Sequence, residues 1–578
     1  MLSSQAGKQD GGSYAEQVPA GTSSEDGYAY SEGTTTEEFI DADGAYDMEL
    51  GYAPEANGMV AETDSYWPGP EYDYVDPFST EEYGKLEETG FVAVATNPLS
   101  TLSSDVDTAS YCNLRRMLND GYGPQDIPVG AVRIEEMLNY FDYDYAAPEG
   151  DDLFGVTVRM GDCPWNPDTK LLVMGFATAE EDQAVQDAGR NLVFLIDSSG
   201  SMDDPRKLPL LKQAFGELVG DLNANDRISI VTYAGAEEVL ASGVPGNKDK
   251  AIMRAIRGIR ADGSTNGEAG LQMAYELAQE NYIDGGVNRI IMASDGDLNV
   301  GMTSESDLYD YVSEMKETGV YLSVLGFGDG NYKDTKMETL ADNGNGQYHY
   351  IDCEEEAERV FGENLTANLV PLADDVKIQV EFNPAQVKGY RLIGYENRAM
   401  SEAEFEDEEA DAGDVGPGHQ FTVAYEVVPV DSEMDIPAAS LKYGQDADDD
   451  ASAQSDAAQS KETQFGDEWA TCTMRYKPVT GGDAEQQAVV RAEDLSADPG
   501  ADWEFAAAVI EFGMLLHDSD YAGNATYDSV LELAKASATE NDLCEEFSEL
   551  VELAEEGGWY DPYGGYYGDD AYTIEDIS

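Results

Sequence analysis

Oxygen-bearing side chains gather at three places in the middle of the chain. Asp197, Ser199 and Ser201 stand at alternate positions directly after a short apolar run, and Gly200 among them allows a tight turn. Thr265 and Asp295 follow further along the chain. Hydroxyl and carboxylate oxygens are the ligands that a small hard cation such as Mg²⁺ or Mn²⁺ prefers. These five residues therefore form a candidate metal site.

The segments around these residues alternate between strand and helix patterns. Short apolar runs predict strands at 191–196, 228–233, 289–293 and 320–327, and apolar residues at helical spacing predict helices at 208–222 and 271–278. Such repeated units predict an α/β fold with a doubly wound, mostly parallel sheet that is covered on both faces. Binding groups gather beyond the C-terminal ends of the strands in such folds, which is where the oxygen donors stand.

An Asp-x-Ser-x-Ser segment by itself is also a common turn or helix cap. The further donors Thr265 and Asp295, placed at comparable ends of elements, favour the metal site over that interpretation. Asp203 and Asp297 are close in sequence, and we expect them to be solvated loop acids rather than residues that tune the site.

The flanking regions have other patterns. Helical spacing predicts two short helices at 108–119 and 132–140, before an extended segment. After Pro371 the apolar period becomes two, which predicts an antiparallel sheet, and helical spacing returns from Trp503. The predicted domains are a disordered acidic Tyr/Gly-rich tether (1–88), an N-terminal region (89–185), the α/β domain (188–368), a C-terminal β-sheet plus helical domain (371–555) and a disordered tail (556–578). Two insertions, Glu402–Asp414 and Gln445–Gln464, are predicted to be solvated loops.

Composition restricts the partners. The 578 residues include 32 Lys and Arg against 118 Asp and Glu, a formal net charge of −86. That balance excludes a conventional nucleic-acid binder and disfavours an anionic membrane surface. No apolar run is long enough to span a bilayer. The start at Met1 lacks the regions of an export signal, so either the protein is cytoplasmic or the signal lies outside this sequence.

Catalytic motifs are missing from the sequence. The three histidines, His349, His419 and His517, belong to no HExxH motif, and there is no Gly-x-Ser-x-Gly elbow, Walker loop or dinucleotide fingerprint. The five cysteines form no CxxC pair, which argues against a zinc knuckle or a redox motif. We therefore expect a binding protein rather than an enzyme.

The candidate site resembles the metal-ion-dependent adhesion site (MIDAS) of von Willebrand factor type A (VWA) domains, in the usual order. The resemblance implies that the hydroxyls of Ser199, Ser201 and Thr265 coordinate the cation directly, while Asp197 and Asp295 act mainly through bound waters. A cation held by neutral hydroxyls stays electrophilic, so an open coordination position would accept a carboxylate of a partner protein.

The resemblance extends to both flanks of the VWA domain. Segments at 91–101, 105–111, 132–141 and 163–167, and later at 376–384, 390–398 and 505–516, are similar to bacterial VWA proteins that have a VWA-associated N-terminal region and a C-terminal domain with no assigned activity. Members of that family are often exported or lipid-anchored at the cell envelope. Tyr111, Phe141 and Trp165 are expected to pack the N-terminal region against the VWA domain rather than to form a ligand cage.

Three functions remain open on the sequence alone. The first is a cell-envelope or extracellular adhesion or assembly module, whose MIDAS cation bridges to an acidic group of a protein ligand. The second is an intracellular assembly factor that couples to an ATPase or chelatase complex. The third is a structural surface component whose metal only stiffens the fold.

Overall fold

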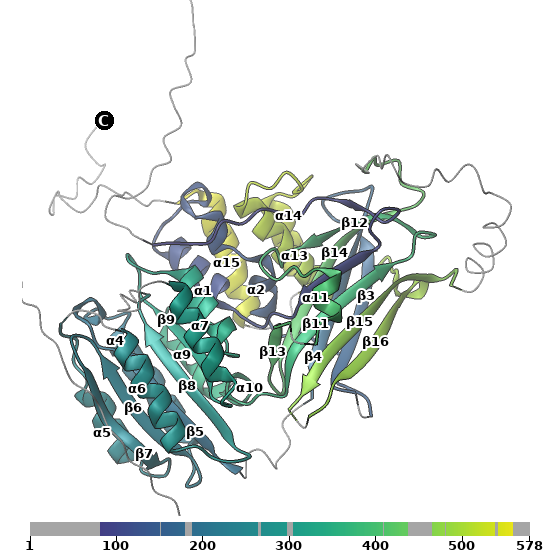
Figure 1. Cartoon of the computed structure of the whole chain (residues 1–578). Helices are drawn as coiled ribbons and strands as arrows, with labels where there is room; N and C mark the ends of the chain where they lie inside the picture. The colour runs from purple at the N-terminus through teal and green to yellow at the C-terminus, as the bar shows by residue number, and fades with distance from the viewer. Residues whose placement is uncertain are drawn as a thin grey trace, which may run out of the picture. The chain divides into compact units, whose positions relative to one another are not determined.

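Three sheets and the helices around them make up the described part of the chain (Figure 1). The computed structural model describes residues 81–150, 152–179, 188–263, 267–296, 305–363, 365–408, 410–436, 465–479, 481–537 and 542–558. Most of the predicted tether and tail, the polar insertion 445–464, Thr265 and Asp297 lie outside these residues. Among the described helices, none has both the length and the apolar character that crossing a bilayer requires.

The central sheet has the order β10-β9-β8-β5-β6-β7. Its strands are β5 (Arg190–Asp197), β6 (Arg227–Tyr233), β7 (Glu237–Pro245), β8 (Val287–Ser294), β9 (Tyr321–Phe327) and β10 (Tyr348–Ile351). Neighbours pair in parallel except β7, which is antiparallel to β6. Every side chain from Leu192 to Ile196 is fully buried, and alternate residues enter the cores on opposite faces. The predicted α/β class and mostly parallel sheet are confirmed.

Helices cover both faces of this sheet (Figure 1). On one face, α4 (Leu208–Asp221), α5 (Asp249–Gly258) and α9 (Glu354–Glu358) share a core with Phe194. On the other, α6 (Gly267–Glu280), α7 (Glu305–Lys316) and α8 (Asp334–Asn343) share a core with Leu195. A π-helical turn (Arg359–Glu363) and α10 (Leu365–Leu369) then lead into the next sheet.

Strands from before and after the central domain combine in two antiparallel sheets. One sheet has the order β1-β12-β14-β4-β3, and the other has the order β13-β11-β15-β16 with β2 also paired to β11. The strands are β1 (Val92–Ala93), β2 (Leu99–Ser103), β3 (Phe154–Asp162), β4 (Lys170–Thr178), β11 (Ala373–Phe382), β12 (Val387–Ile393), β13 (Gly413–Val415), β14 (Gln420–Pro429), β15 (Glu468–Pro478) and β16 (Ala484–Arg491). Phe176 stacks on Phe421, and both belong to a core shared by the two sheets. The segments before and after the central domain thus build one sandwich together, and the central domain is an insertion in the sequence of that sandwich.

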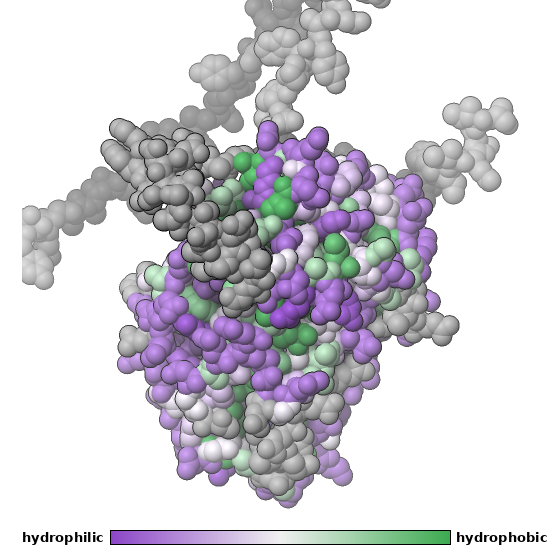
Figure 2. Space-filling model, turned by 90° about the vertical axis from the view of Figure 1, so that its right-hand side faces the viewer, coloured by the Kyte–Doolittle hydropathy of each residue, from purple (hydrophilic) through white to green (hydrophobic). Residues whose placement is uncertain are grey.

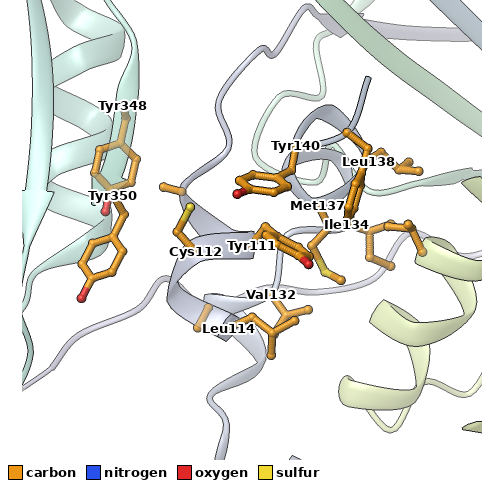
Figure 3. Packing of buried hydrophobic residues seen from close by; sticks show 14 of the residues in the cluster. Tyr111, Cys112, Leu114, Val132, Ile134, Met137, Leu138, Tyr140, Tyr348 and Tyr350 are labelled. Carbon is orange, nitrogen blue, oxygen red and sulfur yellow. The ribbon is translucent and has the colours of Figure 1, made fainter. Parts of the chain in front are cut away.

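A layer of helices also combines segments from before and after the central domain. It contains α1 (Ala109–Asn119), α2 (Ile134–Asn139), α13 (Ala501–Leu516), α14 (Tyr527–Ser537) and α15 (Asp542–Glu556), with short 3-10 turns at Pro124–Asp126, Val129–Ala131 and Ala492–Asp494. Figure 3 shows Tyr111 of α1 lying against Tyr140, and their ring centroids are 4.1 Å apart. Phe141 meets Phe505 of α13 edge to face at 4.8 Å. The two helices predicted at 108–119 and 132–140 are confirmed.

The three predicted packing residues are all buried, which confirms a packing role. Tyr111 and Phe141 belong to the core that includes α13, α15 and the central sheet, and Trp165 donates its indole N–H to Glu426 of β14 at 3.4 Å, on the side of the β14 sheet that faces the helical layer. These residues therefore belong to a core that joins the two flanking segments to the central sheet as well as to each other.

Two described segments differ from the prediction, one from a disordered tether and the other from a solvated loop. Residues 81–88, which we placed in the tether, contact the folded part, where Glu88 accepts a hydrogen bond from Ser519. The acidic insertion 402–414 forms the short helix α11 (Glu402–Glu406), with a capping box at Ser401, and most of strand β13. Phe405 anchors that helix because its side chain is only 3% exposed.

Candidate metal centre

The two aspartates of the predicted site lie at the C-terminal ends of adjacent strands. Asp197 is the last residue of β5, and Asp295 follows Ser294 at the end of β8. The strands pair in parallel, with Ile196 opposite Ala293, so both carboxylates reach the same edge of the sheet. Both aspartates are fully buried.

The turn after β5 directs several oxygens to this edge. The backbone N–H of Ser199 donates to Asp197 Oδ1 at 2.8 Å, and the Ser294 hydroxyl donates to Asp197 Oδ2 at 3.4 Å. The hydroxyl oxygens of Ser199 and Ser201 are 2.9 Å apart. Asp197 is thus held through both of its carboxylate oxygens, while the two serine hydroxyls converge beside it.

A second loop is fixed against this turn by the backbone. The N–H of Gly200 donates to the carbonyl of Gly263 at 3.1 Å, and the N–H of Asp262 donates to the carbonyl of Ser198 at 2.9 Å. Thr265, two residues beyond Gly263, lies outside the described residues. The structure therefore brings together Asp197, Ser199, Ser201 and Asp295 and does not place the fifth predicted residue.

The donor set has the chemistry that a divalent cation requires. Burial raises the pKa of Asp197 to about 7, and the negative charge of Asp295 adds to the increase, although hydrogen bonds from Ser199 oppose it. Buried carboxylates without a counter-charge are costly, and a cation removes that cost. Hydroxyl and carboxylate oxygens fit Mg²⁺ or Mn²⁺.

One positive charge at the site was not predicted from the sequence. Lys207, which precedes α4, is buried, and its Nζ lies 3.0 Å from Asp295 Oδ2. Its position directly before an amphipathic helix, where a buried lysine is unusual, is the signal that could have found it. The ammonium of Lys207 thus provides a counter-charge for Asp295 at this edge of the sheet.

A strap formed by residues 81–83 reaches the loop next to the site. Glu82 pairs with Lys333 through backbone hydrogen bonds of 2.9 and 3.0 Å to Tyr332 and Asp334. Glu81 accepts the N–H of Gly330 at 2.7 Å. The same loop carries Asn331, which contacts both Lys207 and Asp295. The end of the predicted tether is therefore connected to a loop of the candidate site.

The strap depends on the charge of Glu81. This carboxylate also accepts from the buried Arg116 at 3.0 Å. Burial alone would raise the pKa of Glu81, but Arg116 and the N–H of Gly330 outweigh it and hold the pKa below its ordinary value. A depressed pKa means that the ionised form stabilises the folded state above the unfolded pKa, and that this stability is lost as the pH falls through the folded pKa.

We expect Glu81→Gln to lower the free energy of unfolding by about 1–3 kcal/mol at pH 7, because Arg116 loses its counter-ion. The difference from wild type should shrink as the pH falls through the lowered pKa of Glu81, where Glu81 itself becomes protonated. Urea unfolding at several pH values measures it. Glu82→Gln is the matched control, since that side chain is 68% exposed and lies 3.5 Å from Lys333. Equal losses in the two variants would contradict the role of the strap.

A second group of potential ligands is already neutralised. Cys112, Asp352 and Glu356 offer atoms that lie within 4.8 Å of one another. Arg115 donates to Asp352 at 2.6 Å and to Glu356 at 3.2 Å, and it also contacts the Cys112 sulfur at 3.7 Å. The guanidinium fills the role that a metal ion would have there. All five cysteines are free thiols.

Known proteins match all three parts of the chain. The family described as von Willebrand factor type A domain matches residues 191–363, the family described as von Willebrand factor matches 77–173, and the family described as Uncharacterized protein YfbK, C-terminal, matches 367–556. The protein named Uncharacterized protein YfbK from Escherichia coli (strain K12) is 36% identical over 485 residues, which are 82% of this chain and 81% of that protein. The chain belongs to the YfbK family. It is therefore a YfbK-like bacterial protein that contains a VWA domain.

Other similarities cover smaller or larger shares of this YfbK-family chain. Inter-alpha-trypsin inhibitor heavy chain H4 from Homo sapiens is 35% identical over 166 residues, 27% of this chain and 17% of that protein. The solved structure titled von Willebrand factor type A from Catenulispora acidiphila covers 71% of this chain and 91% of its own, with 15% identity and a TM-score of 0.38. VWA domains are protein-interaction modules that are often metal-dependent. The YfbK-family chain thus contains an interaction module at its centre.

Proposed function

We propose that this YfbK-family protein is a metal-dependent protein-binding module of the bacterial cell envelope. A Mg²⁺ or Mn²⁺ ion held by Asp197, Ser199, Ser201, Thr265 and Asp295 would bridge to an acidic side chain of a partner. The observation that supports this most is the meeting of two buried carboxylates and two converging serine hydroxyls at one edge of the sheet. The proposed role is binding, without catalysis.

The contacts within the site suggest different roles for Asp197 and for the two serines. Asp197 is held by the N–H of Ser199 and the hydroxyl of Ser294, so it is oriented before any ion arrives. The hydroxyls of Ser199 and Ser201 carry no charge, and direct coordination by them would leave the ion poorly neutralised. Such an ion supplies a strong attraction for an anionic group.

The acidic charge of the chain is a further reason why binding of an acidic partner would need a metal ion. The protein carries 118 acidic residues against 32 basic ones, and the face in Figure 2 is largely hydrophilic, with only small apolar patches among the described residues. A surface of this kind repels an acidic partner, although screening limits the repulsion to about 8 Å at physiological salt. A divalent cation would supply the local positive charge.

An envelope location is part of the proposal, supported by the family resemblance, and cell fractionation with an antibody tests it.

The experiment uses Mn²⁺ as the ion and glutarate as a small substitute for an acidic side chain. The electron paramagnetic resonance spectrum of Mn²⁺ bound to the full chain should change when glutarate is added, and the apparent Mn²⁺ affinity should rise, because a carboxylate enters the open coordination position. Asp203→Ala should behave as wild type. A Mn²⁺ spectrum and affinity that glutarate leaves unchanged would overturn the bridging function.

A further inference from the structure

Lys207 occupies a position built for a positive charge. Its Nζ donates to Asp295 Oδ2 at 3.0 Å and to Asn331 Oδ1 at 3.2 Å. The lysine side chain is 7% exposed, and the Asp295 side chain is fully buried. A charged group so deeply buried needs partners of this kind, and here one partner is a residue of the candidate metal site.

The aliphatic part of Lys207 is fixed as well. A Cβ added at Gly328 would come within 2.2 Å of the lysine Cε and 2.5 Å of its Cγ. Gly328 has φ of +74°, a conformation that favours glycine, so this position both turns the loop and leaves space for the lysine. The packed aliphatic chain of Lys207 therefore holds the ammonium in a fixed position beside Asp295, unlike the side chain of a flexible surface lysine.

We propose that Lys207 is an internal counter-cation of the metal site, which holds Asp295 in position and lowers the affinity of the site for a divalent ion. The proposal rests on the proposed function, because it takes Asp295 as one of the residues that hold the ion. A fixed positive charge next to such a residue repels an incoming divalent ion. It also keeps the buried carboxylate paired before the ion binds.

This arrangement has a consequence for the partner. A site with weakened affinity holds the ion poorly by itself, and a carboxylate from the partner then adds a larger share of the total attraction. Binding of the ion and binding of the partner would thereby be coupled, since each increases the affinity for the other. Lys207 would be a positioning residue that makes occupancy of the site by the ion depend more on the presence of the partner.

Lys207→Met tests the proposal, because methionine keeps an unbranched apolar side chain against Gly328 and removes the charge. We expect Mn²⁺ to bind about tenfold more tightly, or better, in titration calorimetry of the full chain. Lys212→Met is the matched control on α4: its Nζ donates to the carbonyl of Ile259 at 2.7 Å, and its Mn²⁺ affinity should equal that of wild type. Thermal unfolding provides a second measurement, in which added Mn²⁺ should raise the Tm of Lys207→Met more than that of wild type.

The outcomes separate this proposal from the proposed function. Unchanged or weaker Mn²⁺ binding by Lys207→Met, with a Tm response to Mn²⁺ no larger than that of wild type, would overturn the counter-cation role while the metal-dependent function stands. If wild type and Asp197→Ala gave the same heats with Mn²⁺, the proposed function would fail, and the counter-cation role with it. Tighter binding in Lys207→Met alone among the lysine variants would support the role.

Discussion

Replacement of Arg398 by methionine is expected to lower the free energy of unfolding by about 3–5 kcal/mol, the cost of removing one partner from a buried ion-pair network. Arg398 follows β12 of the sandwich, and its side chain is 11% exposed. It donates to Asp105 and Asp107 at 3.1 Å each and to Asp342 of α8 at 2.7 Å. Without the guanidinium, the buried carboxylates before α1 lose their counter-charge.

The network joins the VWA domain to its flanks. Asp334, Glu338 and Asp342 follow one another at four-residue spacing, so they lie on one face of α8. Arg133 of the N-terminal segment contacts Asp334 at 2.7 Å, and Arg398 of the C-terminal segment contacts Asp342. Loss of Arg398 should therefore weaken the attachment of α8 to both flanking segments.

The loss should depend on pH in a definite direction. Burial raises the pKa of Asp107 well above its ordinary range, and Arg398 opposes that shift. Without Arg398 the folded-state pKa rises further, so the variant keeps its stability below the unfolded pKa and loses it as the pH rises. Urea unfolding should show the gap between Arg398→Met and wild type widening as the pH rises.

Two further variants keep this prediction testable. Arg398→Lys retains a charge and should lose less stability, while Arg227→Met is a control because Arg227 is exposed and bonds to the carbonyls of Asn281 and Tyr282. A loss in Arg398→Met no greater than in Arg227→Met, or a gap that does not change with pH, would show that the network contributes little.

The second large effect concerns the metal. Asp197→Ala should weaken Mn²⁺ binding by about a hundredfold or more, because the site loses its central carboxylate and the turn loses the acceptor for the N–H of Ser199. Asp203→Ala is the control, since Asp203 is nearby in sequence and exposed, as the sequence indicated. Titration calorimetry measures both, and far-ultraviolet circular dichroism checks that the variants fold. An affinity in Asp197→Ala within a few fold of wild type would contradict the assigned role of Asp197.

Local patterns were enough to predict the central sheet and most of the site's position. The apolar run before Asp197 and the one before Asp295 predict buried parallel strands, and the ends of parallel strands share one edge. Adjacent strands β5 and β8 do bring those two residues together. This inference needs no knowledge of distant contacts, which is why the sequence could support it.

Contacts between distant segments could not be predicted in the same way. The pairing of β2 with β11 joins residues more than 270 positions apart, and no periodicity in either segment names its partner. The same holds for Lys207, whose role depends on Asp295 and Asn331 reaching it in three dimensions. Phe405 shows a different difficulty. The acidic composition of its segment predicted a solvated loop, but the burial of this one apolar side chain anchors the helix α11.

The most direct test of the metal site is a crystal of the full chain soaked in Mn²⁺, with anomalous scattering recorded at the manganese edge. We expect one strong anomalous peak at the C-terminal edge of β5 and β8, with the hydroxyl oxygens of Ser199 and Ser201 about 2.0–2.2 Å from it. A saturating soak with no peak between these serines and Asp295, or with manganese bound only elsewhere, would contradict the account.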